Sequence, residues 1–207
     1  MTIRPARPAD TDDLYDICLR TGSDGDDASE QFSDPRLLGA VYVGPYLALE
    51  PALAFVLDDG GRAGGYVLGA LDTREFARAC ERQWWPALRA RYPRDAFASG
   101  TADAEVVAIV HDLPLPEPEV LDSYPSHLHI DLLPRWQGAG WGRRLIDHLI
   151  AELTAAGSPG VHLTASATNT RAIAFYRRLG FVEVVADGGG ITLGRRLDEV
   201  GFRPVSG

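Results

Sequence analysis

Three side chains that can take up or release a proton alternate along one stretch of the chain: His127, His129 and Asp131. Alternation with period two is typical of a β-strand, whose successive side chains point to opposite faces. We therefore expect these three side chains to share a face with Leu133, where a carboxylate beside imidazoles could transfer protons. The two histidines could bind a metal if His162 of a neighbouring strand joined them, but nothing else supports zinc, and we expect no metal site.

A glycine-rich turn follows this strand and precedes a helix. Gly138, Gly140 and Gly142 let the backbone approach a ligand closely and turn its N–H groups inward. The N-terminus of the following helix adds a positive dipole, and Arg143 and Arg144 could add charge that attracts phosphate. The glycine spacing differs from that of the Rossmann and P-loop motifs, so the turn is either an anion-binding loop of another kind or a structural connection.

The elements that must position these residues alternate between strand and helix, which predicts an α/β fold with parallel neighbours in its sheet. From residue 126 onward we expect strands at 127–133, 161–165, 181–185 and 191–193, and helices at 145–153 and 170–179. In the part of the chain before residue 73 we expect a strand at 2–5, a helix capped by Asp10 and ending at Thr21, and a loop at 22–33. A second helix should run from Asp34-Pro35 toward Tyr42, and two strands at 54–57 and 65–71 should form a hairpin.

Residues 73–125 are interpreted as a helical insertion in one domain that spans residues 1–207. Asp72 or Thr73 caps its first helix, which Pro86 should kink or interrupt. A second helical piece covers 102–110, and the stretch 114–125, with its four prolines, is expected to be extended linker.

Composition excludes some classes of partner. The 207-residue chain has a net charge of −9 and no lysine, which argues against a nucleic acid bound through its phosphates. Its apolar runs are too short to span a membrane and its first residues lack an apolar signal region, so we expect no membrane partner. Cys18 and Cys80 lie far apart and are expected to be buried free thiols, which fits a cytoplasmic location.

Two motifs resemble the signatures of one protein family. The run Gln137–Gly142 matches Q/R-x-x-G-x-G/A, the acetyl-CoA pyrophosphate loop of GNAT acetyltransferases, and Asn169–Phe181 matches that family's N-x-x-A-x-x-F-Y-x-x-x-G-F. Nearly the whole chain also resembles the acetyltransferase-like C-terminal domain of animal O-GlcNAcase and its bacterial relatives, on IRPARPADTDDLYDIC, AFVLDDGGRAGGYVLGALDT and the tryptophan-rich helix 76–92. The phosphate loop is degraded in the animal domain and intact here. The likeness does not imply glycosidase activity, which belongs to a separate domain.

The resemblance implies a GNAT fold, in which a central mixed sheet with splayed parallel strands is flanked by helices. Acetyl-CoA is then expected between those strands, with its pantetheine arm paired to the first strand and the acetyl carbonyl polarised by backbone groups of Leu132 and Leu133. Asn169 matches an asparagine that contacts pantetheine, and it could equally be a helix N-cap. The implied cofactor positions are Leu132, Leu133, Gln137, Gly138, Ala139, Gly140, Trp141, Gly142, Asn169, Ala172, Phe175 and Tyr176, to which we add Arg143 and Arg144 for their charge.

The resemblance also implies catalytic roles. Tyr176 matches the tyrosine that protonates the departing CoA thiolate, although it could serve core packing alone. Asp131 stands where many GNAT enzymes have an acidic base. His129 could orient that carboxylate or act as the base itself, and a solvent-mediated route is a third possibility.

Two functions follow from these observations. The chain is either an N-acetyltransferase that passes the acetyl group of acetyl-CoA to a primary amine by direct attack, or a non-catalytic acetyl-CoA-binding or protein-interaction module. The acceptor could be a small amine, an amino sugar or a peptide amine, and the oligomeric state is left open. One loop contains the acidic residues Asp24, Asp26, Asp27 and Glu30, and it could attract a cationic acceptor or be a solvated loop. A helical segment contains the aromatic residues Trp84, Trp85 and Tyr92, which could line an acceptor cleft or pack in the core.

Overall fold

The structure is a computed structural model, and it describes residues 1–198. Within this range seven strands form one sheet in the order β1-β2-β3-β4-β5-β7-β6. The strands are β1 (Thr2–Pro5), β2 (Ala54–Asp58), β3 (Ala63–Ala70), β4 (Ser126–Leu132), β5 (Gly160–Ser166), β6 (Val182–Asp187) and β7 (Gly190–Arg196). The α-helices are α1 (Thr11–Thr21), α2 (Leu37–Tyr42), α3 (Gly44–Leu49), α4 (Thr73–Gln83), α5 (Trp85–Arg91), α6 (Ala102–His111), α7 (Pro118–Ser123), α8 (Trp141–Ala155) and α9 (Thr170–Arg178). The predicted domain end at residue 207 lies outside the described residues.

The sheet is mixed, and its two central strands separate. Strands β1 to β4 are antiparallel neighbours, whereas β4 and β5 are parallel. The parallel register joins Ser126 to Val161 and His127 to His162 and extends no further in the described part of the chain. β5 continues instead as the antiparallel neighbour of β7. The expected α/β sheet with splayed parallel strands is therefore confirmed.

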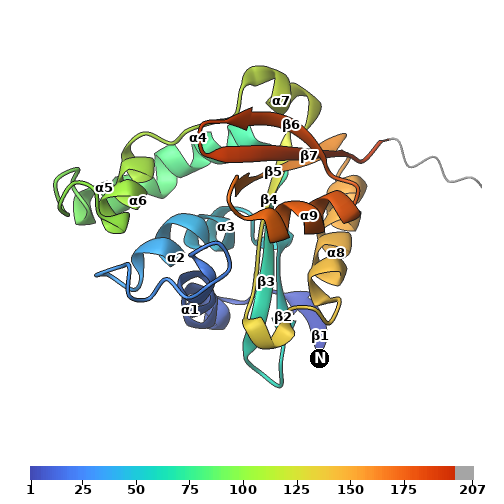
Figure 1. The fold of residues 1–207 in the computed structure, drawn as a ribbon, viewed down its shortest axis with the longest axis horizontal. Helices are drawn as coiled ribbons and strands as arrows, with labels where there is room; N and C mark the ends of the chain where they lie inside the picture. Colours follow the sequence, from blue (N-terminus) through green and yellow to red (C-terminus); the bar gives the residue numbers. More distant parts are fainter. Residues whose placement is uncertain (199–207) are drawn as a thin grey trace, which may run out of the picture.

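Helices cover both faces of the sheet. Helices α1, α2 and α3 lie on one side of β2, β3 and β4, and α8 lies on the other (Figure 1). Tyr66 and Leu68 of β3 pack with the first group of helices, whereas Val67 between them packs with Leu145 and Leu149 of α8. Because both faces are covered, β3 is buried along its whole length, which explains why its sequence is nearly all apolar.

The segment between β3 and β4 is mainly helical. Asp72 caps α4 by accepting a hydrogen bond from the amide of Glu75 at 2.9 Å. After a break at Trp84 the new helix α5 begins at Trp85, with Pro86 in its first turn. Trp85 and Tyr92 are buried in the core cluster on the α1 side of the sheet, and Nε1 of Trp84 donates to the carbonyl of Ala40 at 2.9 Å. These aromatic side chains thus pack the helices together.

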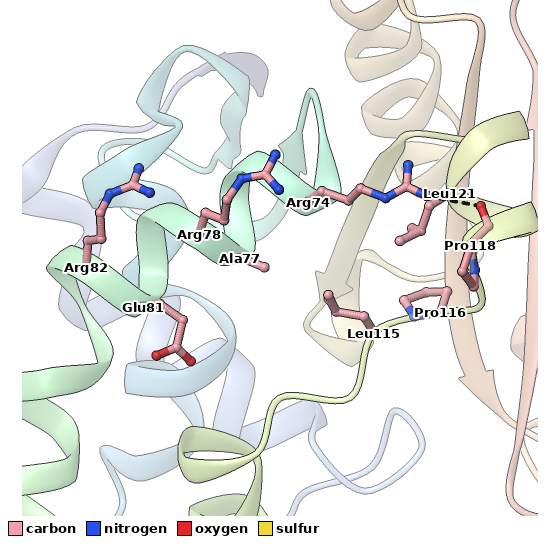
Figure 2. Close-up of a pocket in the computed structure, with 9 residues that line it drawn as sticks. All are labelled: Arg74, Ala77, Arg78, Glu81, Arg82, Leu115, Pro116, Pro118 and Leu121. Atoms are coloured by element: carbon pink, nitrogen blue, oxygen red, sulfur yellow. Dashed lines mark hydrogen bonds between the residues drawn. The ribbon is translucent and has the colours of Figure 1, made fainter.

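The prediction of an extended linker over 114–125 is wrong in its second half, where α7 forms. Pro118 occupies the first turn of this helix, where its fixed φ angle suits the helix and its missing N–H costs no hydrogen bond. Figure 2 shows Arg74 of α4 reaching across to this turn, where its guanidinium donates to the carbonyl of Pro118 at 3.2 Å. The same side chain pairs with Asp122 at 2.8 Å. Contacts from another helix therefore fix a short helix that its own sequence favours weakly.

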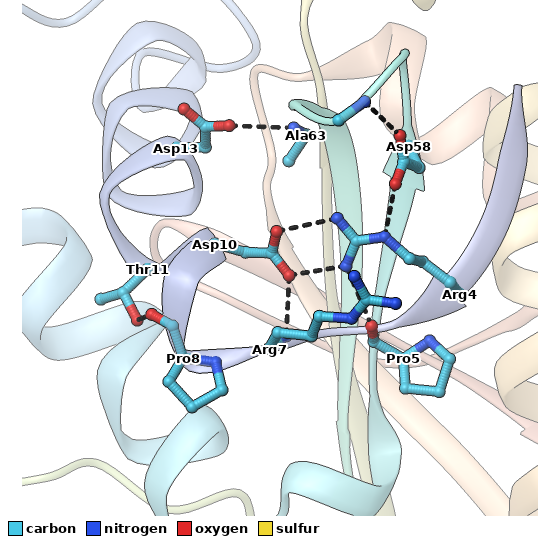
Figure 3. A network of polar contacts seen from close by, with 10 residues as sticks. Arg4, Pro5, Arg7, Pro8, Asp10, Thr11, Asp13, Asp58 and Ala63 are labelled. Atoms are coloured by element: carbon cyan, nitrogen blue, oxygen red, sulfur yellow. Dashed lines mark hydrogen bonds and ion pairs between the residues drawn. The ribbon is translucent and has the colours of Figure 1, made fainter.

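Two helix boundaries also differ from the sequence prediction. Helix α2 begins at Leu37, after a turn in which Asp34 accepts a hydrogen bond from the amide of Arg36 at 2.8 Å. Asp10 stands at the N-cap position of α1, but its side chain does not cap that helix. It accepts instead from the amide of Arg7 at 2.7 Å and from the guanidinium of Arg4, which also binds Asp58 of β2 (Figure 3). Asp10 therefore ties β1 and the turn before α1 to the hairpin. Helix α3 was not predicted.

The two cysteines are free and buried, as expected. No helix in residues 1–198 combines the length and the apolar character needed to cross a lipid bilayer.

Candidate active site

A cavity of about 1010 Å³ opens where β4 and β5 separate. One part of its wall comes from the turn before α8, from β5 and from α9, and the other from α1, α2, α6 and the loop between α1 and α2. Most of the residues expected in the site line this cavity. They are His129, Asp131, Leu132, Gln137, Gly138, Gly140, Gly142, Arg143, Asn169, Ala172, Phe175 and Tyr176.

The glycine-rich turn presents backbone amides at the start of α8. Gly138 and Gly140 have φ angles of 75° and 81°, in the left-handed region that glycine adopts without strain. The first intrahelical bond of α8 runs from the amide of Arg144 to the carbonyl of Gly140 at 3.2 Å. The amides of Trp141, Gly142 and Arg143 therefore have no partner inside the helix and are free to bind an anion.

A third glycine allows close packing behind the turn. A Cβ atom on Gly142 would lie 3.1 Å from the ring of Phe175, a tight contact, so glycine lets α8 and α9 approach this closely without a shift of that ring. Nε2 of Gln137 donates to the carbonyl of Leu132 at 2.9 Å and fixes the turn to the end of β4. The turn is thus held from two sides.

The charged and aromatic residues of this turn differ in whether they line the cavity. Arg143 lines the cavity and also lies 3.2 Å from Asp147, one helical turn away. Arg144 stacks its guanidinium over the ring of Trp141, at 4.6 Å from the ring centre. Ala139, Trp141 and Arg144 are not among the residues that line the cavity.

The backbone of β4 presents an open edge to the cavity. The amide of Leu133 donates to the carbonyl of Gly64 at 3.1 Å, and its carbonyl accepts from the amide of Trp136 at 2.8 Å. Hydrogen-bonding direction alternates along an antiparallel strand, so Ile130 and Leu132 direct their backbone groups away from β3 and toward β5. The expectation for Leu133 needs correction, because both of its backbone groups are occupied. Leu132 keeps its amide free on the edge, while its carbonyl accepts from Gln137.

The half-buried side chain of Asp131 lies in the wall of the cavity. The hydroxyl of Tyr66, directly across from it on β3, donates to Oδ2 of Asp131. Burial raises the pKa of Asp131 to about 7, and the hydrogen bond from Tyr66 acts in the opposite direction. A carboxyl group with this pKa can both accept and release a proton near neutral pH.

Tyr176 faces the same cavity from α9. Its side chain is 9% exposed, and its hydroxyl has no hydrogen-bond partner among residues 1–198. Burial raises the pKa of Tyr176, and the negative charge of Asp131 contributes in the same direction. The phenol therefore keeps its proton at neutral pH and can donate it to a ligand.

Comparison with known proteins agrees with this arrangement. Residues 26–181 match the model of the acetyltransferase (GNAT) family. The chain belongs to the GNAT acetyltransferase family. The crystal structure of SsHAT superposes with a TM-score of 0.88 at 44% identity, over 95% of this chain and 98% of that one. Rat O-GlcNAcase is 30% identical over 88% of this chain, which spans 20% of the length of that relative.

A more distant relative shows the same GNAT fold. Naa20 from Chaetomium thermophilum, solved in complex with a bisubstrate analogue, superposes with a TM-score of 0.56 at 19% identity, over 96% of this chain and 87% of that one.

His127, His129 and His162 of this GNAT chain are neutral at physiological pH. Burial lowers the pKa of His129 to about 4, and it also lowers the pKa values of His127 and His162 below their usual value. Nδ1 and Nε2 of His127 lie 2.8 Å from the Thr73 hydroxyl and 2.7 Å from the Tyr46 hydroxyl. Because Thr73 donates its single proton to the carbonyl of Pro125, we infer that Nδ1 of His127 is protonated and that Nε2 accepts from Tyr46.

These contacts decide what the histidines can do. Both nitrogens of His127 are occupied, and Nδ1 of His162 lies 2.7 Å from the carbonyl of Tyr124. His127 therefore binds the helices to the sheet, and His129, which lines the cavity, is a weak base.

Asn169 caps helix α9. Its Oδ1 accepts from the amide of Ala172 at 3.0 Å, and its Nδ2 donates to the carbonyl of Asp24 at 3.1 Å. Oδ2 of Asp24 accepts from the hydroxyl of Thr168 at 2.8 Å. The acidic loop after α1 is thus fixed to the start of α9 at the cavity wall. Asn169 is a helix N-cap, which the sequence predicted as the alternative to a contact with pantetheine.

Sequence reasoning missed several residues of the cavity wall. Arg171 and Arg178 lie on α9 with Phe175, and the spacing of three to four residues in the family motif could have identified them. Glu105 and Val106 of α6 also line the cavity. No local pattern identifies these two, because only the packing of α6 against α2 brings them to the site.

Proposed function

We propose that this GNAT protein is an N-acetyltransferase that passes the acetyl group of acetyl-CoA to a primary amine by direct attack. One observation carries the proposal: a single cavity joins free amides at a helix N-terminus, an open strand edge, a carboxyl group with a pKa near neutral and an unpartnered buried phenol. In the same proposal, residues 73–125 are an insertion in one GNAT domain. The two free thiols support a cytoplasmic location.

The residues present fit acetyl-CoA. A Cβ atom at Gly138 or Gly140 would meet no atom within 4 Å, so there is space over the turn for a diphosphate. The amides of Trp141, Gly142 and Arg143 would bind that diphosphate, and the positive end of the α8 dipole would add to the attraction. The open backbone edge at Ile130 and Leu132 would pair with the pantetheine arm as an added strand does.

The chemistry is divided between two side chains. Acetyl-CoA, when bound, supplies a thioester acyl group that an amine can attack. Asp131 takes a proton from the incoming ammonium group, which frees the lone pair that forms the new C–N bond. Tyr176 donates its phenolic proton to the sulfur as the C–S bond breaks, and the second proton that the acylated nitrogen loses returns through solvent to the phenolate. Asp131 releases the proton of the ammonium group to solvent, so the products are the amide, the thiol and one proton. His129, neutral and beside Asp131 on β4, lines the amine's approach.

The residues that line the cavity favour a positively charged amine as the acceptor. Asp24, Glu105 and Asp131 line the cavity from three separate parts of the chain, and Phe32 and Tyr42 add aromatic surface. The arginines of the lining, Arg143, Arg171 and Arg178, belong to α8 and α9. Negative charge raises the local concentration of a cation, and aromatic faces attract it further.

Calorimetry and a thiol-release assay test the proposal. We expect acetyl-CoA to bind and a panel of primary amines to accelerate CoA release, with Asp131→Asn binding the cofactor but failing to release thiol. Binding without amine-dependent release would favour the non-catalytic module. Absence of binding would refute both the enzyme and the acetyl-CoA-binding module, and would leave a protein-interaction module.

A further inference from the structure

Asp131 is surrounded by groups without positive charge. His129 follows the same face of β4 and is neutral because burial lowers its pKa to about 4. The remaining neighbours are hydroxyl and thiol groups from three other elements, and all of them are neutral at physiological pH. They are Tyr66 of β3, Cys18 and Thr21 of α1, and Tyr176 of α9. A carboxylate in such surroundings depends on hydrogen-bond donors to keep its charge.

Among these donors, Tyr66 is the strongest. Its ring is 1% exposed, and its hydroxyl is directed at Oδ2 of Asp131 across the β3–β4 register. The hydroxyl of Thr21 donates to the carbonyl of Ile17 at 2.8 Å, so its single proton is used within α1. A cysteine thiol is a weak donor, and burial raises the pKa of Cys18, so it stays protonated and uncharged.

We propose that Tyr66 is the positioning residue that keeps Asp131 ionised, and that it thereby sets the lowest pH at which this carboxylate can act as the base. Burial disfavours the charge of Asp131, and the Tyr66 hydroxyl offsets part of that cost because it binds the charged form more strongly than the protonated form. The role in catalysis rests on the proposed function, whereas the effect on the charge of Asp131 does not.

Two tyrosines on the same side of the sheet allow a matched test. Tyr66→Phe removes the hydroxyl that binds Asp131 and keeps the ring that packs the core. Tyr46→Phe removes an equally buried hydroxyl whose partner is His127. Carbon-13 NMR of the Asp131 carboxyl measures its pKa directly, in the absence of any substrate.

We expect Tyr66→Phe to raise the pKa of Asp131 by about 1 pH unit or more, and Tyr46→Phe to leave it unchanged. Rates of amine-dependent CoA release should follow the same shift. At pH 7 the Tyr66→Phe rate should fall roughly fivefold and recover at about pH 9, whereas a packing defect would lower the rate equally at every pH.

The outcomes separate the two proposals. An unchanged Asp131 pKa in Tyr66→Phe would overturn the role of Tyr66, whatever the rates. A raised pKa without a shifted rate profile would support Tyr66 and remove Asp131 as the base. If Tyr66→Phe does not fold, 3-fluorotyrosine at position 66 provides a second test. Its more acidic hydroxyl should donate a stronger hydrogen bond and lower the pKa of Asp131. An unchanged pKa would refute the role of Tyr66.

Discussion

The hydroxyl of Tyr46 donates a hydrogen bond of 2.7 Å to Nε2 of His127, and this contact joins helix α3 to strand β4. The bond requires an unprotonated Nε2, because a protonated imidazole has no acceptor. Neutral His127 thus links strand β4 to α3 through Nε2 and to Thr73 of α4 through Nδ1.

The first prediction concerns acid stability. Burial lowers the pKa values of His127, His129 and His162 in the folded protein, so the unfolded chain binds more protons below pH 6.5. The free energy of unfolding should therefore decrease as the pH falls from about 6.5 to 4, by up to about 1.4 kcal/mol per pH unit for each histidine. Urea unfolding at several pH values measures this slope. His127→Gln should make the dependence of the free energy of unfolding on pH shallower. An unaltered slope would contradict the lowered pKa of His127 in the folded protein.

The second prediction is that Asp131→Asn stabilises the protein. The pKa of Asp131 is higher in the folded protein than in the unfolded chain, so its contribution to stability is lost as the pH rises through about 7. At pH 8 the substitution should raise the free energy of unfolding by about 1–3 kcal/mol, because it removes a buried charge. The difference should shrink as the pH falls from about 7 to about 4 and disappear only below that, because the folded carboxyl is protonated first and the unfolded carboxyl only near its ordinary pKa of about 3.9. A destabilised variant at pH 8 would contradict this account of the site.

The third prediction compares two glycines with the same backbone strain. Gly140 and Gly157 have φ angles of 81° and 84°, and a Cβ atom on either would meet no atom within 4 Å. Each change to alanine should cost about 1 kcal/mol in stability, because left-handed backbone is unfavourable for alanine. Gly140→Ala alone should weaken acetyl-CoA binding, roughly tenfold, because it displaces the amides of α8. Equal binding losses would contradict the role of the turn.

The fourth prediction separates binding from chemistry at Tyr176. Tyr176→Phe keeps the ring that packs against Phe181 and removes the hydroxyl that faces the cavity. We expect turnover to fall on the order of a hundredfold, because the departing thiolate loses its proton donor. The dissociation constant for acetyl-CoA, measured by calorimetry, should change little. Parallel losses of turnover and affinity would assign Tyr176 to binding or packing.

The fifth prediction concerns the acceptor. Glu105→Gln removes negative charge from the cavity wall, so KM for a diamine should rise roughly two- to fivefold while kcat is kept. The effect should shrink at high salt because the residue is exposed. Glu119→Gln, on the exposed start of α7, is the control and should leave KM unchanged. An unchanged KM in Glu105→Gln would mean that acceptor charge is not recognised there.

The sequence by itself determined the elements of the sheet, the glycine turn and the family. Alternating apolar residues predict the course of β4, and the glycines at 138, 140 and 142 predict a turn with free amides, because both features depend on residues close together in the chain. The break at Pro86 was predictable for the same reason. Local chemistry also favours α7 through Pro118, although the three other prolines of 114–125 concealed it.

Only the tertiary structure decided the chemistry of the cavity. Tyr66 stands 65 residues from Asp131 and meets it through the register of two strands, and Glu105 reaches the wall through the packing of α6 on α2. The direction of the Leu133 amide follows from its pairing with Gly64. Proton affinity depends on burial and on hydrogen-bond donors brought from other elements, so the pKa that makes Asp131 a usable base is a property of the fold.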